Sequence, residues 1–413
     1  MSHIRFSARR VLSRRRVGSR RAIAGAATVL GVLLCGTVGS AQELTIEGPP
    51  PNPGWLFTHM IGASALWDDN VSLSNESEER AADYLTTANP RVSLGFHGRH
   101  LTFDLDYRGS YRFYRTLSAL NGFDQRTVAH VSRRISRDLA WFARNSFTVS
   151  PTTDDIDVAG INFRRVGARL DDFAGGINIT PSRRTTISSA YTFQWVDFSE
   201  EERLAPLFRG GVSHGNTTTI TRKVSRRLSI GGEYNLRHAI VAGGTHQVDI
   251  QHSTANFELD ITRSLELSAG VGYSWFASNR SNKGRSAPAF RVNLTREGQR
   301  IAWTLLYRRS FMPSFGFGGT FQNQELRANL LMPLGRRFDW TSTVTIREDE
   351  PLTPDEIHLR SVWVRNAVSI LATRWMRLEG FYLRMFQDSR RAGGEIGRTV
   401  AGFQVVSTAL RIR

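Results

Sequence analysis

The feature that most constrains this sequence is a strict alternation of apolar and polar residues over segments of about ten residues. In the clearest segment, Leu101–Phe113, apolar residues, aromatic residues and one glycine fill the odd positions, and polar or charged residues fill the even positions. Side chains of a β-strand point to opposite faces in turn, so the segment has one apolar face and one polar face. The pattern recurs at Ile187–Trp195, Leu228–Leu236, Leu265–Trp275, Ile301–Phe311 and Phe338–Ile346.

Short turns are expected between these segments at regular intervals, several of them with Arg beside Ser, Thr or Gly. They lie near Gly98, Arg137, Ser182, Arg226, Arg263, Gly298, Gly335 and Thr373. Each interval has room for two long strands and one longer loop. Eight turns with a strand at each end predict about 18 strands and nine longer loops, with 16 to 18 allowed because residues 163–179 and 375–386 fit either face. The predicted fold is all-β: a transmembrane antiparallel up-and-down β-barrel over residues 55–413.

Other architectures fit this pattern less well. No stretch after Ala41 approaches 18 apolar residues, which excludes a helical membrane protein. A propeller repeats at a similar interval but places four short strands in each repeat. A soluble sandwich buries its apolar faces between two sheets and has strands spaced by about 8–12 residues.

The N-terminus has the organisation of a secretory signal. Eight arginines and no acidic residue precede Ala41, and an uncharged stretch from Ala22 ends in the small-x-small sequence Gly39-Ser40-Ala41. We therefore predict a cleaved signal peptide at 1–41 and a Pro-rich periplasmic lead-in at 42–54; the alternative is an uncleaved anchor. Cys35 is the one cysteine, so the mature chain needs neither a disulfide nor a thiolate.

The basic composition does not indicate a nucleic-acid partner. The formal net charge is +17, but much of it lies in the predicted signal peptide and the remainder is spread along the chain. A nucleic-acid-binding surface requires a cluster of basic residues on one face.

Aromatic residues predict the edges of a lipid-facing band. Trp141, Trp303, Trp340 and Trp375 follow the short turns, and Trp195, Tyr234, Trp275, Phe311 and Phe386 lie near the far ends of strands. The eight residues from Trp303 to Phe311 span roughly 20 Å along the membrane normal at a tilt near 40°. We expect these residues to contact outer-membrane lipids, including lipopolysaccharide, with turn arginines near lipid phosphates.

The opposite face of the strands is predicted to line a hydrated lumen. Its charged members are Asp104, Asp106, Arg108, Arg112, Arg144, Glu233, Arg237, Glu258, Asp260, Glu266, Arg291, Arg308, Arg327 and Arg365. Two interpretations stay open: a polar conduit, slightly cation-rich and therefore favouring anions, or a wall whose charges pair with one another and only keep it wet.

No pattern indicates a cofactor, a resident metal or a catalytic centre. The acidic loop residues Asp68, Asp69, Glu76, Glu78, Glu79, Asp154, Asp155 and Asp157 are read as solvated surface, although Ca²⁺ is a possible ligand of such loops. The nearest enzymatic arrangements are His252-Ser253, whose side chains point to opposite faces, and His238 or His246 approaching Asp249. We predict that the chain is not an enzyme.

Short motifs give a resemblance. Trp67-Asp68-Asp69-Asn70-Val71, Asn89-Pro90-Arg91-Val92 and the Leu101–Phe113 strand resemble the β-barrel porin families of Gram-negative bacteria, including barrels encoded beside exopolysaccharide export systems. The resemblance implies a pore or a helper in polysaccharide secretion, located in the outer membrane and inserted by the barrel-assembly machinery. Such barrels end in an aromatic residue, whereas this chain ends in Leu410-Arg411-Ile412-Arg413.

These observations predict an outer-membrane pore for small solutes, or a component of a polysaccharide export system. The alternatives are a structural or accessory barrel with a closed lumen and, in a different class, an outer-membrane hydrolase.

Overall fold

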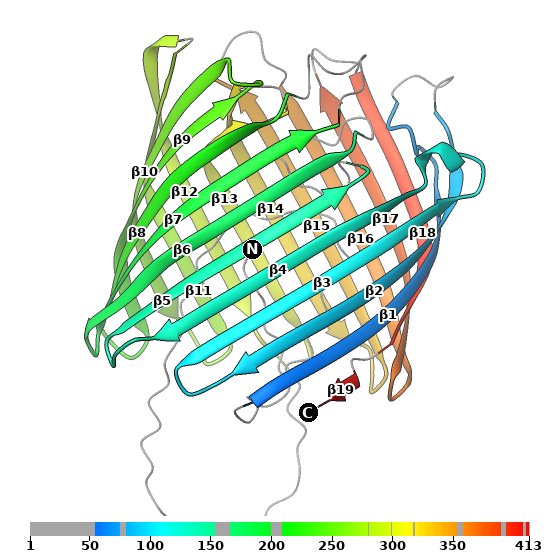
Figure 1. Cartoon of the computed structure of the whole chain (residues 1–413), viewed down its shortest axis with the longest axis horizontal. Coiled ribbons are helices and arrows are strands. Elements are labelled where there is room, and N and C mark those ends of the chain that lie inside the picture. Colours follow the sequence, from blue (N-terminus) through cyan, green and yellow to red (C-terminus); the bar gives the residue numbers. More distant parts are fainter. Residues whose placement is uncertain are drawn as a thin grey trace, which may run out of the picture.

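The structure, a computed structural model, is a closed antiparallel β-barrel of 18 strands (Figure 1). It describes residues 54–74, 80–152, 166–199, 209–279, 281–298, 300–316, 319–352, 358–389, 394–407 and 410–412. The predicted signal peptide and lead-in lie outside these residues, apart from Gly54, which begins the first strand. Across the described residues, no helix is both long enough and apolar enough to span a bilayer.

Each strand pairs with its neighbour in sequence, and the last pairs with the first. The strands are β1 (Gly54–Asp68), β2 (Asp83–His97), β3 (Leu101–Tyr114), β4 (Gly122–Arg134), β5 (Leu139–Ser150), β6 (Ala168–Ser182), β7 (Thr185–Phe198), β8 (Gly211–Lys223), β9 (Leu228–Val241), β10 (His246–Asp260), β11 (Leu265–Ser278), β12 (Ser281–Arg296), β13 (Ala302–Ser314), β14 (Gly319–Pro333), β15 (Phe338–Pro351), β16 (Leu359–Thr373), β17 (Met376–Ser389), β18 (Gly394–Ser407) and β19 (Leu410–Ile412). β18 and the short β19 both pair with β1 and occupy one place in the wall. A short 3-10 helix, η1 (Ser118–Leu120), lies between β3 and β4.

The eight predicted short turns are confirmed, because each named residue lies between two consecutive strands or, for Ser182 and Thr373, at the end of the first of them. The small polar residue of these turns has a defined role. The side-chain oxygens of Ser136, Ser182, Ser225, Thr262 and Thr373 each accept a hydrogen bond from the backbone N–H two residues later. This local bond stabilises a tight reversal of the chain, so the repeated Ser or Thr before Arg is a turn signal.

The prediction of nine longer loops is wrong at four positions. Only four residues separate β9 from β10, β13 from β14 and β17 from β18, and only two separate β11 from β12. At these positions the strands continue past the predicted aromatic girdle, so residues that were expected to form a loop pair with the neighbouring strand. β10 and β11 have 15 and 14 residues, more than the 9–11 or so that a tilted strand needs to cross a membrane.

Large apolar side chains cover the outside of the barrel. Trp55, Ile61, Tyr84 and Phe403 are each more than half exposed. A soluble protein buries such residues, whereas a membrane barrel presents them to lipid. Of the predicted interface aromatics, Tyr234, Trp275 and Trp375 are exposed, and Trp141, Trp195, Trp303 and Trp340 are partly exposed. Their contact with lipid stays a prediction.

Phe311 was wrongly predicted as a girdle residue. Its side chain is 2% exposed, and its ring lies edge-on to that of Phe276, with centroids 6.4 Å apart. Both belong to an apolar cluster at the loop end, the lumenal cluster, which also contains Val196, Ala239, Val248 and Ile250. Phe311 is buried because the upper part of β13 leaves the plane of the wall and turns inward, where alternation no longer separates lipid from lumen.

Candidate functional site

The inner wall is built from strand residues that alternate with the exposed outer residues. On β3, Leu101, Tyr111 and Phe113 are exposed outward, so Asp104, Asp106, Arg108 and Arg112 stand on the opposite face. The same alternation places the other predicted lumenal residues inward: Arg144, Glu233, Arg237, Glu258, Asp260, Glu266, Arg291, Arg308, Arg327 and Arg365. That they line a conducting path stays a prediction.

Ion pairs and hydrogen bonds join several of these residues to neighbouring side chains, and Asp106 with Arg108 joins two of the predicted residues to each other. Asp104 contacts His97 at 2.8 Å, and Arg365 contacts Glu379 at 2.6 Å. Arg112 donates to Asp124 and also to Thr152. Cross-strand pairing of this kind is the ordinary outcome for charges on neighbouring strands.

Two carboxylates are each bracketed by two arginines. Asp106 accepts from Arg91 at 2.7 Å and from Arg108 at 2.6 Å. On the far side of the barrel, Glu325 contacts Arg308 at 2.7 Å and Arg327 at 2.8 Å. We call the first group the Asp106 cluster (Asp106, Arg91 and Arg108) and the second the Glu325 cluster (Glu325, Arg308 and Arg327). Counting these groups alone, each cluster has two positive charges and one negative charge. Glu325 is 2% exposed, so its ion pairs are poorly screened by water.

Sequence reasoning missed Glu325, Arg91 and the neighbouring pair of Arg347 with Asp349, which are 2.8 Å apart. The signal was present, because Asn323, Glu325 and Arg327 alternate with Gln324 and Leu326 on β14. Arg327 is among the predicted lumenal residues, and the same alternation places Glu325, two residues earlier, on that face. Asn323 donates to Asp349 at 2.6 Å, which connects β14 to β15.

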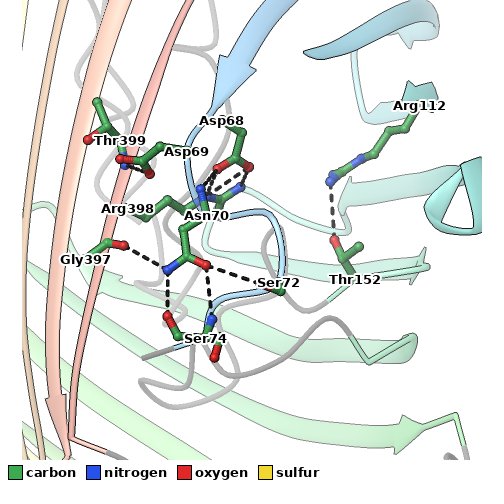
Figure 2. A network of polar contacts seen from close by, with 10 residues as sticks. All are labelled: Asp68, Asp69, Asn70, Ser72, Ser74, Arg112, Thr152, Gly397, Arg398 and Thr399. Carbon is green, nitrogen blue, oxygen red and sulfur yellow. Dashed lines mark hydrogen bonds and ion pairs between the residues drawn. The ribbon is translucent and has the colours of Figure 1, made fainter. Parts of the chain in front are cut away.

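The Trp67–Val71 motif, which contributed to the resemblance, forms a polar network at the seam between the first and last strands (Figure 2). Asp68 contacts Arg398 of β18 at 2.7 Å. The backbone N–H of Asp69 donates a hydrogen bond to the backbone C=O of Thr399. The Asp69 carboxylate in turn accepts a hydrogen bond from the backbone N–H of Thr399. The Asn70 amide donates to the carbonyls of Ser74 and Gly397, at 2.8 Å and 2.9 Å.

These contacts correct the interpretation of Asp68 as solvated surface. Asp68 is 0% exposed, and Asp69 contacts Arg384 at 3.6 Å. Two apolar side chains hold the segment in the barrel mouth: Val71 packs near Leu85 and Tyr114, and Leu73 packs near Met385 and Ile396. Glu76, Glu78, Glu79, Asp154, Asp155 and Asp157 lie outside the described residues. Within the part of the chain that the structure describes, no His, Cys, Asp and Glu group has a metal-binding arrangement.

The two histidine pairs considered for catalysis lie on different faces. His238 contacts Asp249 at 2.7 Å, as anticipated, and both side chains are about half exposed on the outer surface. His252 shares a 2.6 Å hydrogen bond with Ser274, not with Ser253, and also bonds the backbone of Phe311.

A closed antiparallel barrel with an apolar exterior and a charged interior defines the chain as an outer-membrane β-barrel. The barrel geometry alone supports this class.

No protein-family model matches the chain, and no curated protein matches it. Similar solved structures include OpdQ of Pseudomonas aeruginosa, with 11% identity, coverage of 87% of this chain and 98% of that chain, and a TM-score of 0.46. OccAB2 of Acinetobacter baumannii has 8% identity, coverage of 87% and 98%, and a TM-score of 0.48. The siderophore receptor PirA of Pseudomonas aeruginosa has 8% identity, coverage of 88% and 81%, and a TM-score of 0.45.

Proposed function

We propose that the barrel is a passive channel for small polar solutes and that it favours anions. The observation that carries the proposal is the bracketing of Asp106 and of Glu325 by two arginines each. Each cluster contains two arginines and one carboxylate on the inner face, and rings of charge select ions by sign. An 18-stranded barrel is wide enough to hold water unless its lumen is filled by other parts of the chain.

The main alternative is a barrel whose lumen is closed. The upper β13–β14 hairpin does lie in the lumen, packed by Phe311 and Phe315 against β9, β10 and β11. Among the described residues, this hairpin packs against β9, β10 and β11, with no comparable packing against β2–β5. The Asp106 cluster on β2 and β3 stands on the β2–β5 side, so we expect the solute path to follow that side.

Single-channel recording in planar bilayers tests the proposal. Purified mature protein should give stepwise currents, and the reversal potential in a KCl gradient should indicate chloride preference. The variant Arg91→Gln with Arg108→Gln should shift the reversal potential toward cation preference. Arg226→Gln with Arg227→Gln, in an exposed turn, is the matched control and should leave it unchanged. Folded protein that gives no current at high concentration would instead support the closed barrel.

A role in polysaccharide export is a narrower form of this proposal. Its support is the sequence resemblance only, and its test is whether cells that lack the chain still secrete polysaccharide. Normal secretion would limit the proposal to small solutes.

A further inference from the structure

One seam of the barrel is joined over only part of its length. Seven residue pairs connect β12 to β13, ending at Phe290 opposite Arg309, whereas thirteen pairs connect β13 to β14. Beyond Phe290, toward the loop end, β12 stays paired with β11. The two strands therefore diverge at the loop end, and within the described part of the chain neither diverging segment has a partner strand on that side.

The sequence contains a reason for this divergence. Pro288 lies in the diverging segment of β12, and Pro313 lies in that of β13. Proline has no N–H to donate to a ladder and is confined to edge strands or bulges. Two prolines on facing segments oppose pairing in the same stretch of the seam.

The diverging part of β13 is held inside the barrel. Residues on both of its faces are buried, including Phe311 at 2% and Ser314 at 0% exposure. The His252 ring of β10 bonds the backbone of Phe311 and also Ser274 of β11. The hairpin is therefore fastened to β10 and β11, and the free edge of β12 forms a rim beside it.

The rim lies at the level of the outer aromatic girdle. Pro288 is paired with Tyr273, and Ser286 is paired with Trp275, on the neighbouring strand. Tyr273 and Trp275 are 55% and 44% exposed, and exposed aromatic residues of this kind mark the boundary between hydrocarbon and headgroups. Unpaired backbone groups are costly in hydrocarbon, so a free edge is tolerated where headgroups and water reach it.

Apolar and polar surfaces meet at this rim. Ala287 packs against the lumenal cluster that contains Phe276 and Phe311. A cavity of about 290 Å³ adjoins the same stretch and is lined by Trp275, Phe276, Gly284, Arg285 and Ser286, together with Asp249, Gln251 and Ala277. The cavity lining lies on β10, β11 and β12, and Phe276 belongs both to this lining and to the lumenal cluster, so the cavity and the cluster meet at that side chain.

We propose that the β12–β13 seam is a lateral portal through which a fatty-acid-like amphiphile passes between the outer leaflet and the lumen. Its polar headgroup contacts Arg285 and the free backbone edge of β12. Its alkyl tail lies against Phe276, Ala287 and Phe311. This route differs from the polar channel in solute class and in path, and it requires only that the barrel spans the membrane.

Photo-cross-linking with a diazirine-bearing palmitic acid tests the portal. Mature protein in phosphatidylcholine nanodiscs is irradiated with the probe, and adducts are located by mass spectrometry. We expect adducts on the inward residues Phe276, Ala287 or Phe311, reduced by excess unlabelled palmitate. Ala287→Trp should lower adducts at Phe311 at least fivefold by filling the passage, and the milder Ala287→Leu should lower them less. Ala401→Trp is the control, because Ala401 is paired with the exposed Trp67 in a continuous part of the wall.

Adducts restricted to outward residues would overturn the proposal, since they would report only surrounding lipid. So would labelling of Phe311 that is unchanged in both Ala287 variants. If Ala287→Trp does not fold, as judged by gel migration of unheated protein, Ala287→Leu decides the question. The ionic conductance of the same variants separates the two proposals, because a portal can be labelled in a barrel that conducts no ions.

Discussion

The buried ion pair at the seam between β1 and β18 gives a prediction with a definite magnitude. Replacing Asp68 by Asn removes a carboxylate that pairs with Arg398, whose side chain is 13% exposed, while Asp68 itself is fully buried. Breaking a buried ion pair from one side costs about 3–5 kcal/mol, because the remaining buried charge loses that ionic partner. The substitution also weakens the acceptor of the Asn70 backbone N–H, 3.1 Å away.

Denaturant unfolding of the protein in detergent measures this effect, followed by tryptophan fluorescence and by heat-dependent gel migration. The matched control is Asp339→Asn, which removes a carboxylate 3.1 Å from Arg377, where the two side chains are 29% and 24% exposed. An ion pair with that exposure contributes at most about 1 kcal/mol. We expect Asp68→Asn to lower the free energy of unfolding several times more than Asp339→Asn does.

The double variant Asp68→Asn with Arg398→Met completes the test. Removing both charges should recover part of the lost stability, because no buried charge is then left without a partner. Equal losses for Asp68→Asn and Asp339→Asn would refute the argument, since they would show that burial does not set the strength of the seam.

Three further predictions concern the wall, the hairpin and the outer surface. Glu325→Gln removes the carboxylate between Arg308 and Arg327, so the preference of the channel for anions should increase. The measurement is a larger shift of the reversal potential in a KCl gradient. An unchanged reversal potential would show that the Glu325 cluster does not face the solute path. His252→Ala removes the bonds to Ser274 and to the Phe311 backbone, so single-channel currents should fluctuate more as the β13–β14 hairpin loosens; a current identical to that of the parent would show that other contacts hold it. Val271→Arg places a charge on an outward position that is 52% exposed. The free energy of unfolding, measured with denaturant in lipid, should fall by about 2–4 kcal/mol if the position is near the membrane midplane and by less near its edges. A loss of stability no larger than that of Val271→Ala would place this position outside the hydrocarbon.

Much of the barrel follows from local sequence. The alternation on β3 assigns each side chain to a face without knowledge of the neighbouring strands, and Ser or Thr before Arg marks turns by a bond within the turn. These signals are local, so they predicted the 18 strands and all eight short turns. The strands within 163–179 and 375–386 carried weak alternation, yet their places in the wall are filled by β6 and β17.

The errors arise where a residue's environment depends on distant parts of the chain. Phe311 has the alternation of an outward residue, but its strand leaves the wall because pairing with β12 stops. Pro288 and Pro313 were visible signs of that break, and we did not use them. Asp68 was read as solvated because acidic loop residues usually are, whereas its partner Arg398 is 330 residues away in sequence.

That separation has a consequence for how the barrel assembles. Asp68 is made early and Arg398 near the end, so Asp68 stays without this partner until the final strand has docked against the first. A barrel that inserts without completing this closure leaves a carboxylate exposed at its free edge, which disfavours burial of that edge in lipid. The Asp68–Arg398 pair therefore stabilises the completely inserted barrel and not a partly inserted one. The pair forms in the last step of folding, and such folding is slow because the paired segments are far apart in sequence.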